Sequence, residues 1–145
     1  MQLKPVALVS CLGAALVVGP AQASEGLAVL GALTCEPVRV TQGFIEGCLA
    51  SEPALRGRYA TLVAEWTARN ARDAATLEGQ CHTDLESQMP DARERDETWA
   101  RIHRINDNTI RSNVAERSAK KDGCEIALQE IRDGKADLGG FLKKP

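Results

Sequence analysis

Two long segments of the chain repeat apolar residues at steps of three and four, the spacing of one face of an α-helix. The first runs from about residue 55 to 81, where Pro53 suits the first turn and Gly79 predicts the end. The second runs from about residue 90 to 117. Asp91 and Glu94 favour its start because the N-terminus of a helix stabilises negative charge. The pattern therefore predicts two long amphipathic helices.

Two shorter segments add to this pattern. Residues 41–49 cluster apolar side chains and predict a short helix, and residues 124–132 predict another between two Asp-Gly pairs. No stretch alternates apolar and polar residues as a strand would, although residues 38–40 could be extended without changing the class. We expect an all-α protein, a small disulfide-stapled bundle of about four helices with a loose C-terminal tail from residue 139.

The inner faces of the two long helices define the expected core. Asparagines lie in these stripes, and because a buried amide needs partners, we expect them to form hydrogen bonds across the helix interface and set its register. The two tryptophans also lie in the stripes and are expected to anchor the core; an exposed binding platform is the alternative. The expected core residues are Leu55, Tyr59, Leu62, Trp66, Asn70, Trp99, Ile102, Asn106 and Ile110, with Asn113 in the same register.

The N-terminal segment has the features of a secretory signal peptide. Residues 5–24 carry no charge, follow a single Lys4 and contain the small-x-small pattern Ala21-Gln22-Ala23. We expect residues 1–23 to be removed and residues 24–145 to form a single domain, periplasmic or secreted, in a bacterium. An uncleaved membrane anchor and lipidation of Cys11 are the alternatives; after cleavage we expect no stable membrane insertion.

Cleavage would leave four cysteines, and an even number in an exported chain predicts two disulfides. Cys35, Cys48, Cys81 and Cys124 lack the close pairs that zinc sites use. Alternating helix directions favour the pairs Cys35–Cys81 and Cys48–Cys124. The rival pairing is Cys35–Cys48 with Cys81–Cys124, and the sequence alone does not exclude it.

Charge and motif content argue against several functional classes. With 18 basic and 20 acidic residues, the net charge of −2 provides no excess of positive charge for nonspecific binding of nucleic acid. The chain has no Gly-x-Ser-x-Gly, no phosphate-binding loop and no Cys-x-x-Cys. His82 and His103 belong to no ligand pair of known spacing. We expect a protein without enzymatic activity, metal or cofactor, in which replacing either histidine with Ala leaves the function intact.

The expected partner-binding site is the segment that joins the two long helices, which we predict to be a loop. Loops on a rigid scaffold often carry binding residues, and this one offers acids, amides and a methionine. Its candidate residues are Gln80, His82, Asp84, Glu86, Gln88 and Met89.

Residues 35–59 resemble the opening of a family of small bacterial envelope proteins that includes lysozyme inhibitors. The likeness rests on Cys35, Thr41-Gln42 and Cys48, and on Leu55 with Tyr59 one turn later. The spacings depart from those of the family, and its later cluster of tryptophan, arginine and cysteine has no clear match.

From the exclusions above and this resemblance we expect an exported protein-binding module that inhibits, or gives immunity against, an envelope-acting enzyme. Its partner would be another protein of the envelope. The alternatives are a structural or assembly component of the cell envelope, and a minor enzyme or metal carrier that uses His82 and nearby acids.

Overall fold

The computed structural model describes residues 32–142, and within that range it contains helices and no strand. The bundle consists of α2 (Pro37–Ser51), the 3-10 helix η1 (Pro53–Leu55), α3 (Leu62–Gln88), α4 (Ala92–Ser118), α5 (Gly123–Arg132) and α6 (Gly139–Leu142). This is the small all-α bundle that the sequence predicts. The expected signal peptide at residues 1–23 lies outside the described residues.

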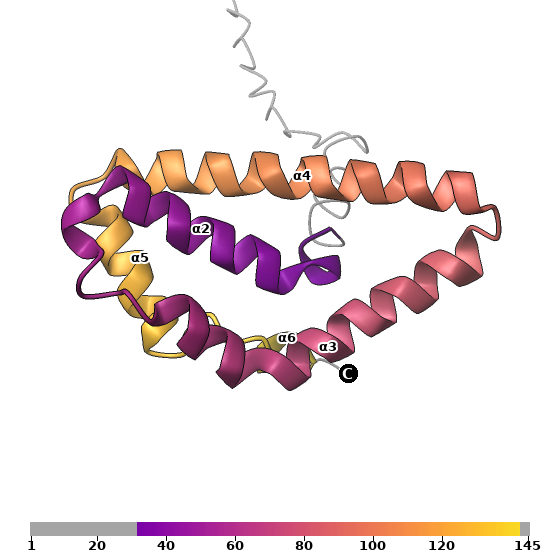
Figure 1. The fold of residues 1–145 in the computed structure, drawn as a ribbon, viewed down its shortest axis with the longest axis horizontal. Coiled ribbons are helices and arrows are strands. Elements are labelled where there is room, and N and C mark those ends of the chain that lie inside the picture. Colours follow the sequence, from indigo (N-terminus) through magenta and orange to yellow (C-terminus); the bar gives the residue numbers. More distant parts are fainter. Residues whose placement is uncertain (1–31, 143–145) are drawn as a thin grey trace, which may run out of the picture.

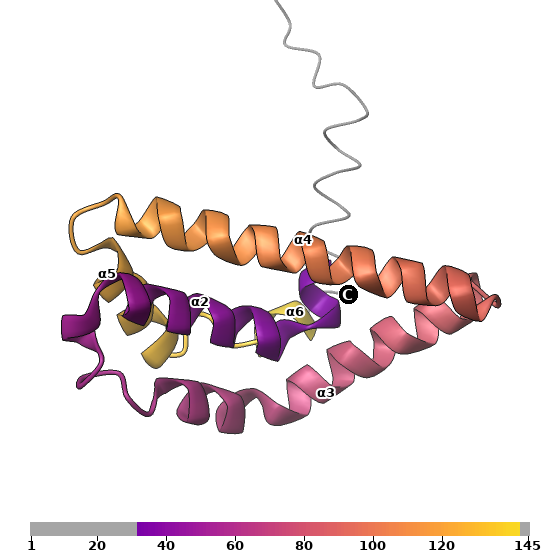
Figure 2. The same cartoon turned by 45° about the horizontal axis from the view of Figure 1, so that its top comes forward.

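The two longest helices, α3 and α4, form a hairpin that is closed at residues 89–91 and opens toward its other end (Figure 1). Helix α2 lies beside α4 and runs in the same direction, and α5 spans the open end of the hairpin (Figure 2). None of the helices within residues 32–142 is long and apolar enough to span a membrane.

Helix α3 begins later and ends later than the sequence pattern predicts. Residues 56–61 form turns after η1, so the helix starts at Leu62, and it continues through Gly79 to Gln88. It stops at Met89, whose φ of −131° and ψ of 83° are extended, because a following proline disfavours helical backbone. The predicted loop at residues 80–89 is therefore wrong, since all but the last of these residues belong to α3.

The ends of the other helices have local causes. Proline at the first position of α2 suits a helix start, and residues 38–40 are helical, not extended. The carboxylate of Asp91 caps α4 by accepting a 2.9 Å hydrogen bond from the amide of Glu94. At the start of α5 only glycine fits, because a Cβ on Gly123 would clash with the carbonyl oxygen of Arg117. Residues 139–142 form α6, so this part of the expected loose tail is ordered.

The buried side chains form two clusters. The larger cluster joins α2, α3 and α5 and contains Tyr59, Leu62 and Trp66. The smaller one surrounds Cys35 and Cys81 and includes Ile102. Of the expected core residues, Leu55, Tyr59, Leu62, Trp66, Asn70, Ile102 and Asn106 are buried.

Three residues expected on the inner face of α4 are not fully buried. Trp99 is only partly buried, at the edge of the smaller cluster. Ile110 is also half-buried, and Asn113 is exposed. Trp99 lies one turn before His103, where α2 begins, so α2 does not cover it. Ile110 lies against Gly43 of α2 and is half-buried there. The expected core role of Trp99 and Ile110 is corrected accordingly.

Two disulfides hold the bundle together. Cys35 pairs with Cys81 and Cys48 with Cys124, at Cα–Cα distances of 5.3 and 5.5 Å. This is the pairing that alternating helix directions favour, and the local rival is absent. The bridges close separations of 46 and 76 residues, for which loop closure alone predicts about 4 kcal/mol of stabilisation each.

Candidate functional site: a groove between three helices

A groove of about 1020 Å³ lies between α2, the C-terminal half of α3 and the middle of α4. Its walls carry aromatic, charged and small residues from all three helices. The lining residues are Cys35, Glu36, Val38, Arg39, Gln42, Gly43, Glu46, Glu78, His82, Trp99, His103, Asp107, Ile110 and Arg111. Two of them, Trp99 and Ile110, are those that the sequence pattern assigns to the core. Trp99 is accessible because α2 does not reach it, whereas Ile110 lies against Gly43 of α2 and is half-buried.

Three aromatic rings form a row in this groove. The imidazole of His82 on α3 lies 4.7 Å from the indole of Trp99 on α4, centroid to centroid, with 44° between the planes. One turn further along α4, the imidazole of His103 lies 6.2 Å from the same indole. These distances are typical of interacting aromatic pairs. The row joins α3 to α4, so His82 is an exposed residue of α3 whose ring packs against Trp99, and not a residue of a loop.

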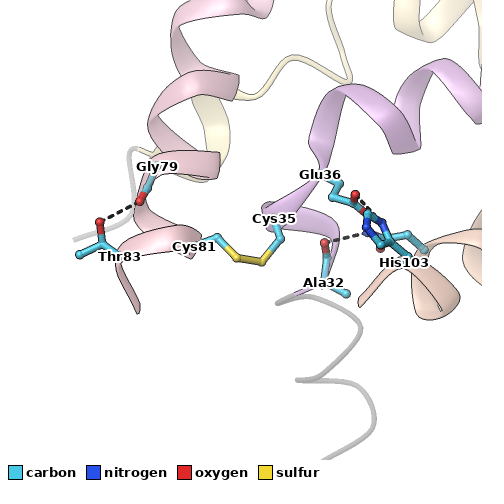
Figure 3. The surroundings of a disulfide bond; sticks show 8 residues. Ala32, Cys35, Glu36, Gly79, Cys81, Thr83 and His103 are labelled. Atoms are coloured by element: carbon cyan, nitrogen blue, oxygen red, sulfur yellow. Dashed lines mark hydrogen bonds and ion pairs between the residues drawn. A yellow bond between two sulfur atoms is a disulfide. The ribbon is translucent and has the colours of Figure 1, made fainter. Parts of the chain in front are cut away.

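Glu36 organises the groove at the start of α2. Its Oε1 lies 2.7 Å from Nδ1 of His103, and its Oε2 accepts hydrogen bonds from the amide of Asn106 at 2.8 Å and from Arg39 at 3.3 Å. Arg39 also donates to Asp107 at 2.6 Å. Figure 3 shows Glu36 beside His103, next to the disulfide that ties Cys35 to α3. The bridge and these bonds hold Cys35 and Glu36, which directly precede α2, against α3 and α4.

Asn106 performs the register role expected of a core asparagine. Its Nδ2 donates to the carbonyl of Ala32 at 3.0 Å as well as to Glu36, so it connects α4 to the segment before α2. Its Oδ1 is buried without a hydrogen-bond partner in the part of the chain described here. Such an atom lowers stability relative to a satisfied amide.

The groove has an excess of negative charge. Four carboxylates line it, from Glu36, Glu46, Glu78 and Asp107, against the two guanidiniums of Arg39 and Arg111. The first and last of these acids pair with Arg39 or His103. Among residues 32–142, Glu46 receives only a neutral amide, from Gln42. Glu78 has neither a hydrogen bond nor an ion pair with any residue from 32 to 142. Uncompensated negative charge is therefore concentrated at Glu46 and Glu78.

The predicted partner-binding residues lie on different faces of α3. His82 points into the groove with Glu78, which is one turn away. Gln80, Asp84, Gln88 and Met89 line a separate hollow of about 440 Å³ beside the smaller core cluster, and Glu86 is exposed outside both. The structure therefore does not bring the six residues together, because successive even positions on a helix are about 200° apart.

A second polar cluster anchors the C-terminal segment to α3. The guanidinium of Arg69 donates to both carboxylate oxygens of Asp137, at 3.1 and 2.9 Å, and to the carbonyl of Ile131 at 2.8 Å. Asn70 donates to the same carboxylate and accepts a bond from the amide of Leu138. The hydrogen bond from Arg69, reinforced by Asn70, lowers the pKa of Asp137 despite the opposing effect of burial. One signal of this cluster is visible in the sequence, an asparagine in an apolar stripe.

The described residues offer no set of metal ligands. Between residues 32 and 142, no three His, Cys, Asp or Glu side chains are arranged to hold a metal ion. The four cysteines are paired in disulfides, so their sulfurs do not act as thiolate nucleophiles. The arrangement of aromatic rings and charges around an open groove is suited to recognising another molecule through its surface.

Comparisons with known proteins add no family to this description. A search with protein-family models finds no match to the chain, and searches of the curated proteins and of the solved structures find none either. The resemblance of residues 35–59 to envelope inhibitors thus remains a hypothesis, and function has to be argued from the groove.

Proposed function

We propose that this protein is an exported, non-enzymatic binding module that holds another protein of the bacterial envelope in the groove between α2, α3 and α4. The observation that carries the proposal is the half-buried Trp99 in contact with His82 inside that groove. Tryptophan and arginine are the side chains that most often dominate binding energy at protein interfaces, and this groove offers both.

The covalent framework supports an extracytoplasmic location. Four cysteines in two disulfides suit a compartment that is oxidising, such as the periplasm. They also make the groove rigid, because Cys35 anchors the segment that carries Glu36. A rigid site loses little conformational entropy when it binds, which favours affinity. Inhibition of an envelope-acting enzyme is the activity we propose for such a module.

The position of His82 changes one expectation from the sequence. A histidine on a solvated loop could be replaced by Ala without consequence. In the groove, the ring centroid of His82 lies 4.7 Å from that of Trp99, and His82 forms part of the groove wall. We therefore expect His82→Ala to weaken partner binding while leaving the fold intact, because its side chain is exposed.

Capture from a periplasmic extract of the source bacterium tests the proposal. The immobilised wild-type protein should retain one partner stoichiometrically, and Trp99→Ala and His82→Ala should each reduce its retention. Ile126→Ala is the matched control, because Ile126 is 52% exposed and lies outside the groove. Circular dichroism of each variant checks the fold. Equal capture by wild type and both groove variants, or loss of capture only with Ile126→Ala, would contradict the proposal.

A further inference from the structure

We infer that the groove recognises a cationic side chain, an arginine of the partner protein, which lies against the aromatic row and pairs with Glu78. The inference rests on the proposed function and specifies the chemistry of the partner segment. It follows from three features of the groove: its aromatic rings, its excess of carboxylates, and Glu78, which has no hydrogen bond or ion pair with residues 32–142.

The aromatic row provides the first half of the recognition. The faces of aromatic rings attract cations, tryptophan most strongly, and the planar guanidinium of arginine also stacks on them. Trp99 is only partly buried, and the imidazoles of His82 and His103 lie 4.7 and 6.2 Å from its indole, centroid to centroid. A guanidinium that enters the groove therefore meets a wall of rings contributed by both α3 and α4.

The carboxylates provide the second half. Glu78 lies one turn from His82 on α3, so both side chains are on the same face of that helix and line the same groove. Glu78 has no ionic partner among residues 32–142, and Glu46 across the groove on α2 receives only the amide of Gln42. An arginine can pair with a carboxylate through two parallel hydrogen bonds. The groove thus combines aromatic rings on which a guanidinium can stack with the carboxylate of Glu78, which accepts no hydrogen bond from residues 32–142.

The charge balance favours this occupant over an acidic or an uncharged one. With four carboxylates against two guanidiniums, the groove attracts a cationic segment and repels an acidic one. Arg39, one of the two guanidiniums, is already engaged with Glu36 and Asp107. An uncharged sugar could stack on Trp99 but would leave Glu78 without compensation, so we include a glycan as a rival in the test.

The test follows the two indole N–H signals by ¹⁵N NMR during titration with an acetylated Gly-Arg-Gly amide. Trp66, whose indole donates to the carbonyl of Ala136 in the core, is the internal reference, and Trp99→Phe assigns the signals. We expect a saturable shift of the Trp99 signal and none for Trp66. The same peptide with citrulline, the neutral isostere of arginine, should bind more weakly by about fivefold or more.

Two glutamate variants distinguish an ion pair between Glu78 and the arginine of the peptide from a general effect of negative charge on binding. Glu78→Gln should weaken binding of the arginine peptide by about fivefold. Glu86→Gln removes the same charge from the same helix outside the groove and should leave the affinity within a factor of about two. Equal binding of the arginine and citrulline peptides, equal effects of the two variants, or a chitotriose titration that shifts Trp99 as strongly in Glu78→Gln as in wild type would each overturn the inference.

The outcome is independent of the capture experiment. If Trp99→Ala abolishes capture of the partner while the arginine peptide fails to shift the Trp99 signal, the proposed function stands and the cationic occupant is wrong. If the arginine peptide binds as expected while Trp99→Ala captures the partner normally, the groove recognises guanidinium groups but is not the partner site.

Discussion

The imidazole of His82 packs against the indole of Trp99 with a centroid distance of 4.7 Å, which joins α3 to α4 near the closed end of their hairpin. Both residues line the groove that α2 leaves open. The contact depends on α3 remaining helical beyond Gly79. It makes His82 and Trp99 parts of one surface, which neither residue indicates in the sequence.

Removing either disulfide should lower stability, but only removing the one between Cys35 and Cys81 should also weaken partner binding. Replacing Cys48 and Cys124 with Ser removes a bridge from the interior, where both residues are fully buried, and should lower the free energy of unfolding by about 4 kcal/mol. Replacing Cys35 and Cys81 should lower it by a similar amount and also loosen the segment that carries Glu36. Urea denaturation measures the first effect, and partner affinity per folded molecule measures the second. Equal partner affinity in both double variants would contradict this division.

Gly47 should be sensitive to a single added methyl group. A Cβ at this position would lie 2.7 Å from Cγ2 of Val114, a β-branched side chain that cannot move aside easily. Overpacking of this kind costs about 1–3 kcal/mol, against a gain in helix propensity of about 1 kcal/mol. We therefore expect Gly47→Ala to be destabilising in urea denaturation.

Gly79 provides the opposite case on α3. It has no atom within 4 Å of the position a Cβ would take, and its helical conformation suits alanine. Gly79→Ala should raise the free energy of unfolding by about 0.5–1 kcal/mol. A stabilising effect of Gly47→Ala would show that the close approach of α2 and α4 is wrong, and a destabilising effect of Gly79→Ala would show that α3 has no open space at that position.

Asp137 should make stability depend on pH in the acid range. Its pKa is lowered in the folded state by the hydrogen bond from Arg69 and by Asn70. A carboxyl of this kind stabilises the fold above the pKa it has when unfolded, about 4, and the stabilisation is lost as the pH falls through the lower folded value. Asp137→Asn should therefore reduce stability at pH 7 by about 1 kcal/mol and have little effect well below pH 4.

Denaturation at several pH values measures this difference between Asp137→Asn and wild type. Asp84→Asn is the control, because its exposed carboxylate takes part in no hydrogen bond or ion pair with residues 32–142. If the stability difference between Asp137→Asn and wild type persists unchanged to low pH, the substitution destabilises the fold for steric reasons. Loss of the carboxylate charge would then not be the cause.

The periodic pattern of apolar residues was sufficient to predict the helices but not the residues at which they begin and end. Leu77, Cys81 and Leu85 continue the apolar stripe of α3 at steps of four, and their burial outweighs the modest helix-breaking effect of Gly79. Pro90, not Gly79, is the residue that ends the helix, since it restricts the backbone of Met89. At the other end, Leu55 and Tyr59 keep the helical spacing and are buried although they lie in η1 and the following turns.

The groove itself could not be derived from the pattern. Trp99 belongs to the inner stripe of α4, but burial also requires a helix opposite it. Helix α2 starts opposite His103, as the contact between His103 and Glu36 shows, and Trp99 lies one turn before that point. The position of α2 along α4 depends on tertiary contacts, namely the hydrogen bonds and ion pairs of Glu36 and the disulfide of Cys35. Local sequence patterns do not predict such contacts.

Site-specific photo-cross-linking in living cells measures directly whether an envelope protein lies in the groove. A benzophenone amino acid replaces Gln42, which is exposed and lines the groove, or Ile126, which is exposed outside it. We predict a covalent adduct with a single envelope protein from position 42, reduced when His82→Ala is added, and no such adduct from position 126. Adducts from position 126 alone, or from position 42 at an unchanged level in the His82→Ala background, would contradict this prediction.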